Sequence, residues 1–117
     1  MYGDQRLRSS ERLRQRREFQ RVFQHGKKFV SPLFVLYICP SSEPFSRLGM
    51  AVSKRVGKAV VRNRIKRRIR ELFRHHKMCF KSPCDVIIVA RQRAANASFV
   101  DFTRQFLTLL NRYQPSK

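Results

Sequence analysis

The sequence has few acidic residues. Asp and Glu number only 7 of 117 residues, against 27 Lys and Arg, so the formal net charge is +20 at pH 7. The acids are scattered, and no two have the spacing of a catalytic carboxylate pair or a Mg²⁺ site. A compact domain with this charge repels itself unless a polyanion neutralises it. Nucleic acid is therefore the expected partner, and a self-sufficient enzyme is disfavoured.

Other absences exclude further classes of protein. Glycine occurs only four times, without a glycine-rich phosphate loop, and no apolar run approaches the roughly 18 residues of a membrane span. Cys39, Cys79 and Cys84 form no C-x-x-C pair, so we expect no disulfide framework and a cytoplasmic location. A zinc site from His75, His76, Cys79 and Cys84 is disfavoured, because these spacings match no usual zinc motif.

The apolar residues nevertheless predict a packed core. They make up 42% of the chain and include 10 Phe, which is enough for one core but, at this length, not for two. Residues 1–9 lack periodicity and are predicted to be a flexible basic arm. We therefore expect residues 1–117 to form a single domain, and its apolar residues follow core periods, which argues against a membrane partner.

Apolar periodicity and turn residues predict seven elements. The first helix is expected from about residue 10, most clearly over 16–24, and is predicted to end at Gly26 in a left-handed conformation. The other predicted elements are strands at 29–30, 33–39, 47–54 and 84–91, and helices at 60–75 and after the capping box of Ser98 and Asp101. This order is typical of an α+β domain with helices packed on a small mixed sheet.

The most informative stretch covers residues 54–70, with nine basic residues and no acid. Its apolar residues keep a helical spacing, so the charges occupy the other faces of the helix and the loop before it. Arg62, Lys66 and Arg70 fall at i, i+4 and i+8, a like-charge arrangement that destabilises an isolated helix and that phosphates relieve. Ordinary solvated faces mix both signs, so this stretch predicts polyanion binding. Asn63 can donate and accept, which suits a base or a sugar.

Aromatic residues form a second candidate site. Phe19 and Phe23 share one face of the first predicted helix, and Val35 and Tyr37 share one face of a predicted strand. Composition alone favours a core role for these side chains. The alternative is a platform on which unpaired bases stack beside arginines.

Four segments of the chain, in this order, resemble the protein subunits of bacterial ribonuclease P: RLRQRREFQRVFQHGKK, FVLYI, RLGMAVSKRVGKAVVRNRIKRRIRE and DVIIVAR. The resemblance covers nearly the whole chain. Its most specific part is the run Lys-Arg-x-Gly-x-Ala-x-x-Arg-Asn-Arg-x-Lys-Arg, which generic basic helices do not reproduce. It implies an α-β-β-β-α-β-α fold with four strands, three helices and a left-handed crossover, a hand that is rare.

The resemblance also implies a function, namely 5′-end maturation of tRNA by a ribonucleoprotein. In such a ribonucleoprotein the catalytic RNA would hold the Mg²⁺ ions, so the resemblance implies that this chain has no catalytic residue, metal or cofactor of its own and no obligate protein partner. The residues implied to bind this RNA are Lys54, Arg55, Lys58, Arg62, Asn63, Arg64, Lys66, Arg67, Arg68 and Arg70. The residues implied to line a cleft for the single-stranded 5′ leader of precursor tRNA are Phe19, Phe23, Val35, Tyr37, Lys66, Arg70 and Arg91. The alternative is a ribosomal or ribosome-assembly RNA-binding protein with no role in cleavage.

Overall fold

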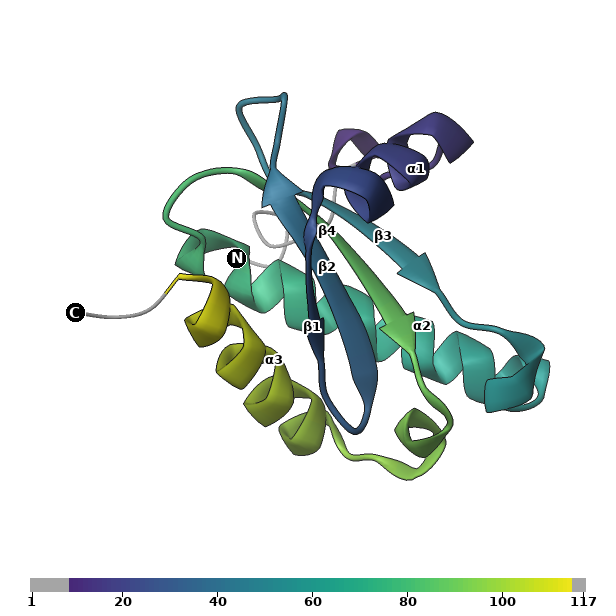
Figure 1. The fold of residues 1–117 in the computed structure, drawn as a ribbon. Coiled ribbons are helices and arrows are strands. Elements are labelled where there is room, and N and C mark those ends of the chain that lie inside the picture. Colours follow the sequence, from purple (N-terminus) through teal and green to yellow (C-terminus); the bar gives the residue numbers. More distant parts are fainter. Residues whose placement is uncertain (1–8, 115–117) are drawn as a thin grey trace.

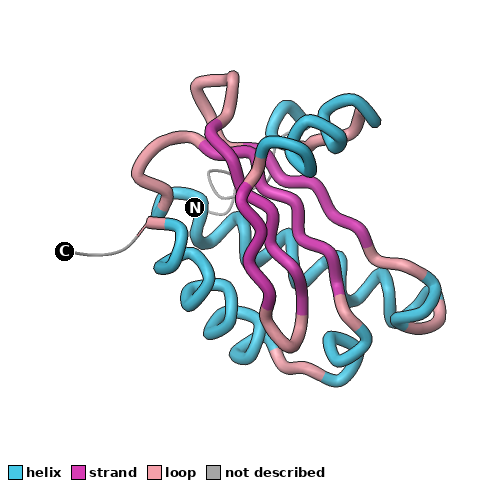
Figure 2. The backbone as a smooth tube through the Cα atoms, viewed as in Figure 1, coloured by secondary structure: helices cyan, strands magenta, loops and turns pink. Residues whose placement is uncertain are grey.

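A computed structural model describes residues 9–114, so residues 1–8 of the predicted arm lie outside this range. Three helices and one four-stranded sheet confirm the predicted α+β class and element order (Figures 1 and 2). The strands are β1 (Lys27–Val30), β2 (Phe34–Pro40), β3 (Arg47–Ala51) and β4 (Cys84–Ala90). The helices are α1 (Arg16–His25), α2 (Ala59–His76) and α3 (Phe99–Tyr113). Short 3₁₀ segments precede α1 (η2, Ser9–Glu11) and lie between the helices (η3, Lys54–Val56; η4, Lys77–Cys79; η5, Gln92–Asn96).

The sheet is mixed, with strand order β1-β2-β4-β3. Strands β1, β2 and β4 pair antiparallel, whereas β3 pairs parallel with β4. Parallel neighbours need a crossover, and here α2 supplies it. In Figure 1, β3 and β4 run towards the lower right, α2 passes behind them, and β4 lies to the lower left of β3. The crossover is therefore left-handed, as the resemblance implied.

The main core lies between one face of the sheet and helices α2 and α3. Alternate residues of β2 point into it, and the capping box of Ser98 and Asp101 opens α3 as predicted. Leu33 precedes β2 and also turns into this core. The largest fully buried side chains there are Phe34, Leu36, Ile38, Ile65, Ile69, Leu72, Phe73, Ile88, Phe102, Phe106 and Leu109.

Helix α1 covers only part of the opposite face. Beneath it lies a small second core of Leu13, Val22, Cys39 and Ile87. With ten residues, α1 is about 15 Å long, and the helix packs against β2 and β4 near the start of β4 (Figure 1). The cross-strand row nearest the other end of the sheet, Val35–Val89–Ala51, remains only half-buried.

The start of α1 differs from the prediction. The helix begins at Arg16, not near residue 10, because the preceding chain is extended beside β3. Arg12 forms a bridge with Leu48, and the Leu13 N–H donates to the Leu48 carbonyl at 2.9 Å. A capping box of Gln15 and Glu18 then opens the helix.

The glycine at the end of α1 has a reason other than the one predicted. Gly26 is extended, with φ −78° and ψ 155°, and not left-handed. A Cβ on Gly26 would lie 2.5 Å from the Val22 oxygen and 3.2 Å from the Ile38 oxygen. Both are backbone atoms that cannot swing aside, so this position needs glycine for close approach.

We therefore expect Gly26→Ala to destabilise the protein by about 1 to 3 kcal/mol, the usual cost of forcing atoms into a well-packed site. Urea unfolding followed by circular dichroism measures the change. The control is Gln24→Ala, an exposed substitution in the same helix, which should change stability by less than about 0.5 kcal/mol. Equal midpoints for the two variants would show that the backbone at residue 26 adapts freely.

Candidate nucleic-acid interface

A buried carboxylate attaches α1 to the sheet. Asp85 of β4 is fully buried. Arg47 of β3 binds it with two hydrogen bonds, Nε to Oδ1 at 2.9 Å and Nη2 to Oδ2 at 2.7 Å, and Arg21 of α1 donates to the same Oδ2. Arg47 Nη1 also donates to Glu18 Oε2 of α1 at 2.9 Å. One ionic cluster thus joins α1, β3 and β4.

The other carboxylate of this cluster is held in its ionised form. Partial burial raises the pKa of Glu18, but backbone N–H donors of Gln15 and Arg14, together with Arg47, outweigh burial. The net result is a pKa below the ordinary value for glutamate, so Glu18 is charged at neutral pH. The pKa of Arg47 is raised, chiefly by its hydrogen bonds to Asp85.

The docked helix brings three predicted aromatic residues together. The rings of Phe23 and Tyr37 meet edge to face with centroids 4.8 Å apart, and Phe19 lies 6.3 Å from Phe23. Phe23 is 41% exposed. Phe19 lies over Gly49, where a Cβ would come within 2.7 Å of its ring, so the small residues of β3 admit this ring. Phe19 therefore belongs partly to the small core, while Phe23 presents its ring to solvent.

Beside these rings, aliphatic side chains of the sheet are only half-buried. Val35 lies two residues from Tyr37 on β2, on the same face, and pairs across the sheet with Val89 and with Val30, which is 48% exposed. The Lys28 ammonium stands 5.9 Å from the centre of the Tyr37 ring, a cation–π distance. Aromatic, aliphatic and cationic groups thus line one open strip of the sheet.

Phe19, Phe23 and Tyr37 are called the aromatic group below. Two predicted cations of α2 lie beside it. A cavity of about 250 Å³ between α1, β3 and α2 is lined by residues that include Phe19, Lys66, Arg70, Arg12 and Arg14. The structure therefore brings Lys66 and Arg70 beside Phe19, as the resemblance implied. Arg12 and Arg14 were not among the predicted site residues, because they lie outside the basic segment and reach this cavity only through the extended chain before α1.

Three other arginines of α2 make contacts within the domain. Arg64 Nη2 donates to the Ala95 carbonyl of η5 at 3.1 Å, and Arg68 donates to the Ala97 carbonyl. Arg62 Nε donates to the Gly57 carbonyl at 3.1 Å. These side chains help to hold the neighbouring turns, a structural role that helical spacing did not indicate.

The remaining cations of the predicted set are free to bind a ligand. Within residues 9–114, no hydrogen-bond or ion-pair partner is present for the side chains of Lys54, Arg55, Lys58, Lys66, Arg67 and Arg70. Asn63 is exposed on the outer face of α2, next to Arg67 by helical spacing. The one acid of α2, Glu71, is paired with Arg74 in the later turns of the helix, and Glu11 is paired with Lys77. The face formed by η3 and the first turns of α2 is therefore cationic without compensation.

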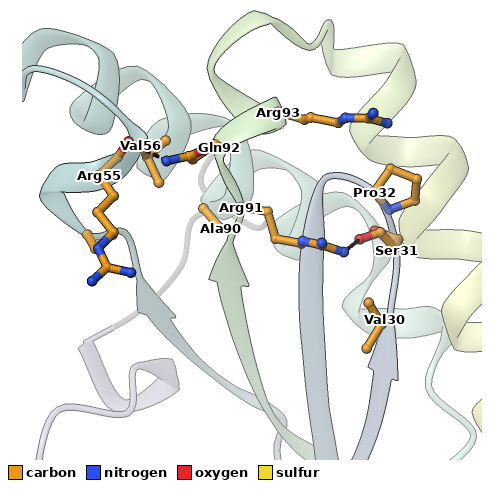
Figure 3. Close-up of a pocket in the computed structure, with 10 residues that line it drawn as sticks. Val30, Ser31, Pro32, Arg55, Val56, Ala90, Arg91, Gln92 and Arg93 are labelled. Atoms are coloured by element: carbon orange, nitrogen blue, oxygen red, sulfur yellow. Dashed lines mark hydrogen bonds between the residues drawn. The ribbon is translucent and has the colours of Figure 1, made fainter.

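Arg91 lies apart from the aromatic group. It follows the last residue of β4, about 13 Å along the strand from Ile87, and its Nη1 donates to the Ser31 carbonyl at 2.9 Å. It lines a second, larger cavity together with Arg55 and Arg93 (Figure 3). The structure thus does not place Arg91 beside Phe19 and Phe23.

The candidate zinc ligands do not come together in the structure. Among residues 9–114, no three His, Cys, Asp or Glu side chains gather where a metal ion could bind. His75 contacts Glu71, His76 bonds the Leu72 carbonyl, and Cys84 is buried in the main core, so the zinc ligands considered from sequence are dispersed. In the same range, no helix combines the length and apolar character needed to cross a membrane.

Comparison with known proteins agrees with this geometry. A family model described as Ribonuclease P matches residues 7–114. The ribonuclease P protein component of Syntrophus aciditrophicus (strain SB) is 41% identical over 106 residues, covering 91% of this chain and 89% of that protein. A solved RNase P protein from Staphylococcus aureus superimposes with a TM-score of 0.80 at 34% identity, covering 89% of this chain and 95% of that one. The RNase P protein from Thermotoga maritima gives 0.77 at 34% identity, covering 87% and 96%.

The ionic cluster generates a stability prediction. Asp85→Asn leaves Arg47 and Arg21 without their buried counter-charge, so we expect a loss of about 3 kcal/mol or more in the free energy of unfolding. Urea unfolding at neutral pH measures it. Glu71→Gln removes a half-exposed acid that pairs with Arg74 at the surface of α2 and should change stability by less than about 1 kcal/mol. An Asp85→Asn variant as stable as the control would show that the cluster is not what holds α1.

Proposed function

The chain belongs to the Ribonuclease P family, and on this premise we propose that it is the subunit of ribonuclease P that binds the catalytic RNA and the 5′ leader of precursor tRNA. The family assignment supports this hypothesis over the alternative of a ribosomal or ribosome-assembly protein. We further propose that it acts in the bacterial cytoplasm, with Mg²⁺ held by the RNA subunit.

One observation carries the RNA-binding part of the proposal. The free cations of η3 and α2 form a surface without acids, and at its inner edge Lys66 and Arg70 meet Phe19 in one cavity. Phosphates on this surface release the counterions of the RNA and remove the repulsion among the cations. Within residues 9–114, three of the nine cations of this segment, Arg62, Arg64 and Arg68, bond carbonyls of the domain. A structural role alone does not account for the other six, which have no partner in this range.

The leader-binding part rests on the strip beneath α1. Phe23 and Tyr37 present aromatic surface beside Lys28, and a half-buried aliphatic floor continues past them. Unpaired bases stack on such rings irrespective of sequence, while cations track the backbone. A leader held here supplies orientation of the precursor and no bond chemistry. All catalytic groups then reside in the RNA.

Truncation of the exposed rings tests the leader cleft. Phe23→Ala and Tyr37→Ala should each weaken binding of precursor tRNA to the reconstituted holoenzyme, because a stacked base contributes about 1 to 3 kcal/mol. This corresponds to roughly 5- to 150-fold in the dissociation constant. Binding of mature tRNA, which has no leader, should be nearly unchanged.

The matched control is Phe99→Ala, which removes a half-buried ring of α3 distant in sequence from the cleft. It should alter neither substrate's affinity, and thermal melts of all three variants report folding. If a stably folded Phe23→Ala variant binds precursor and mature tRNA with equal losses, the leader-binding role is wrong.

The salt dependence of RNA binding tests the cationic surface. Arg67→Ala and Lys58→Ala remove exposed cations without an internal partner. Each lost phosphate contact should reduce the slope of log affinity against log salt by roughly 0.7 to 0.9, measured with ribonuclease P RNA. Arg112→Ala, an exposed cation of α3, is the control and should leave the slope unchanged. Unchanged slopes with lowered melting temperatures would instead assign Arg67 and Lys58 to folding.

A further inference from the structure

Two charged side chains of α1 bind the sheet, and neither is a predicted RNA-binding or leader-binding residue. Glu18 Oε2 accepts from Arg47 Nη1 of β3 at 2.9 Å, and Arg21 donates to Asp85 Oδ2 of β4. Arg47 and Asp85 are themselves register partners on the paired strands β3 and β4, so the sheet presents a fixed pair of opposite charges. The helix is therefore held at two points that lie about one turn apart.

Apolar packing alone does not fix the rotation of α1 about its own axis. Among the residues of this helix, only Val22 is fully buried, and a single buried side chain lets a short helix turn about that contact. At roughly 100° per residue, Glu18 and Arg21 lie on one side of Val22. Phe19 and Phe23 lie on its other side. A rotation that loosened the ion pairs would therefore also move the two rings.

The contacts of the rings depend on this rotation. Phe23 meets Tyr37 edge to face, with the ring centroids 4.8 Å apart and the planes at 90°, a geometry that aromatic pairs prefer. Phe19 approaches the backbone of Gly49 so closely that a Cβ there would lie 2.7 Å from the ring. Because Phe23 is 41% exposed, little packing holds it from the outside. The orientation of both rings is thus set from the side of α1 that carries the ion pairs.

We propose that Glu18 and Arg21 are positioning residues for the single-stranded leader. They fix the rotation of α1 through their ion pairs with the sheet, and so present the aromatic group to unpaired bases without touching the RNA themselves. The inference rests on the proposed leader-binding function and adds to it two residues whose side chains face the sheet. Helical spacing did not single them out, because their partners Arg47 and Asp85 lie on distant segments of the chain.

The negative charge of Glu18 separates positioning from simple attraction. An acid near bound RNA repels phosphate, so its neutralisation strengthens binding wherever the summed charge of the protein decides the affinity. Positioning predicts the opposite sign, because Glu18→Gln loses the ion pair with Arg47 and loosens the helix. Weaker binding of the leader after removal of a negative charge is therefore the result that only positioning predicts.

Neither Glu18→Gln nor Arg21→Gln leaves a buried charge without a partner. In Arg21→Gln, Asp85 keeps both of its hydrogen bonds from Arg47, and in Glu18→Gln, Arg47 keeps Asp85. Neither substituted residue belongs to the main core between the sheet and helices α2 and α3. Both variants should therefore retain the folded core, unlike Asp85→Asn.

The two variants are tested in the reconstituted holoenzyme with precursor and mature tRNA. Each should weaken binding of the precursor by about two- to fivefold, as for a partly screened ion pair, and leave binding of mature tRNA unchanged. Arg21→Lys keeps the positive charge and should restore most of the affinity for the precursor. The matched control is Arg17→Gln, which removes an exposed cation from the same helix and should leave the ratio of the two affinities unchanged.

A double-mutant cycle shows whether Glu18 acts through the rings. Once Phe23→Ala has removed the exposed ring, addition of Glu18→Gln should cost less precursor affinity than it does alone, because contacts that act together are not additive. Additive losses, unchanged or stronger binding of the precursor by Glu18→Gln, or equal losses for mature tRNA would overturn the proposal. So would a thermal melt in which either variant has lost the folded core, since the role would then be structural. If Phe23→Ala alone leaves precursor binding unchanged, the proposed leader binding itself fails.

Discussion

The candidate site depends on one interaction, the ion pairs that the buried carboxylate of Asp85 makes with Arg47 and Arg21. The carboxylate is fully enclosed, and it receives Arg47 from β3 and Arg21 from α1. A buried charge of this kind is tolerated only when it is fully paired, and removal of a partner is then strongly destabilising. Because the cluster attaches α1 near the start of β4, the helix covers one end of the sheet face and leaves the other end open. The position of the rings and the uncovered aliphatic row both follow from that attachment.

The cations of the chain serve two different purposes. Arg47 and Arg21 neutralise Asp85, and Arg64 and Arg68 bond carbonyls around η5, so these side chains stabilise the fold. The cations of η3 and the outer face of α2 have no such partners among the described residues. With most described acids engaged in ion pairs elsewhere, the mutual repulsion of these free cations is left for an external polyanion to relieve.

Aromatic and cationic side chains lie together where α1, β3 and α2 converge. Gly49 allows the Phe19 ring to approach the sheet, and this approach sets the depth at which α1 sits. Phe23, one turn further along α1, then projects past the small core and meets Tyr37 edge to face. The same packing that buries Val22 therefore keeps Phe23 accessible. A binding surface for unpaired bases arises here as the outer edge of a hydrophobic core.

Much of the fold is encoded in local patterns that can be read from the sequence. The spacing of Ile65, Ile69 and Leu72 predicts a helix, because side chains on one face of a helix recur every three to four residues. The capping box of Ser98 and Asp101 predicts the start of another. The acid-free charge of residues 54–70 likewise indicates a polyanion partner, because net charge needs no coordinates. The tertiary structure alone decided which cations are free, since Arg64 and Arg67 look equivalent until η5 packs against one of them. It also decided that Gly26 serves close approach and that Arg55, Arg91 and Arg93 share one cavity. These relations join residues from separate segments of the chain, and no local periodicity records them.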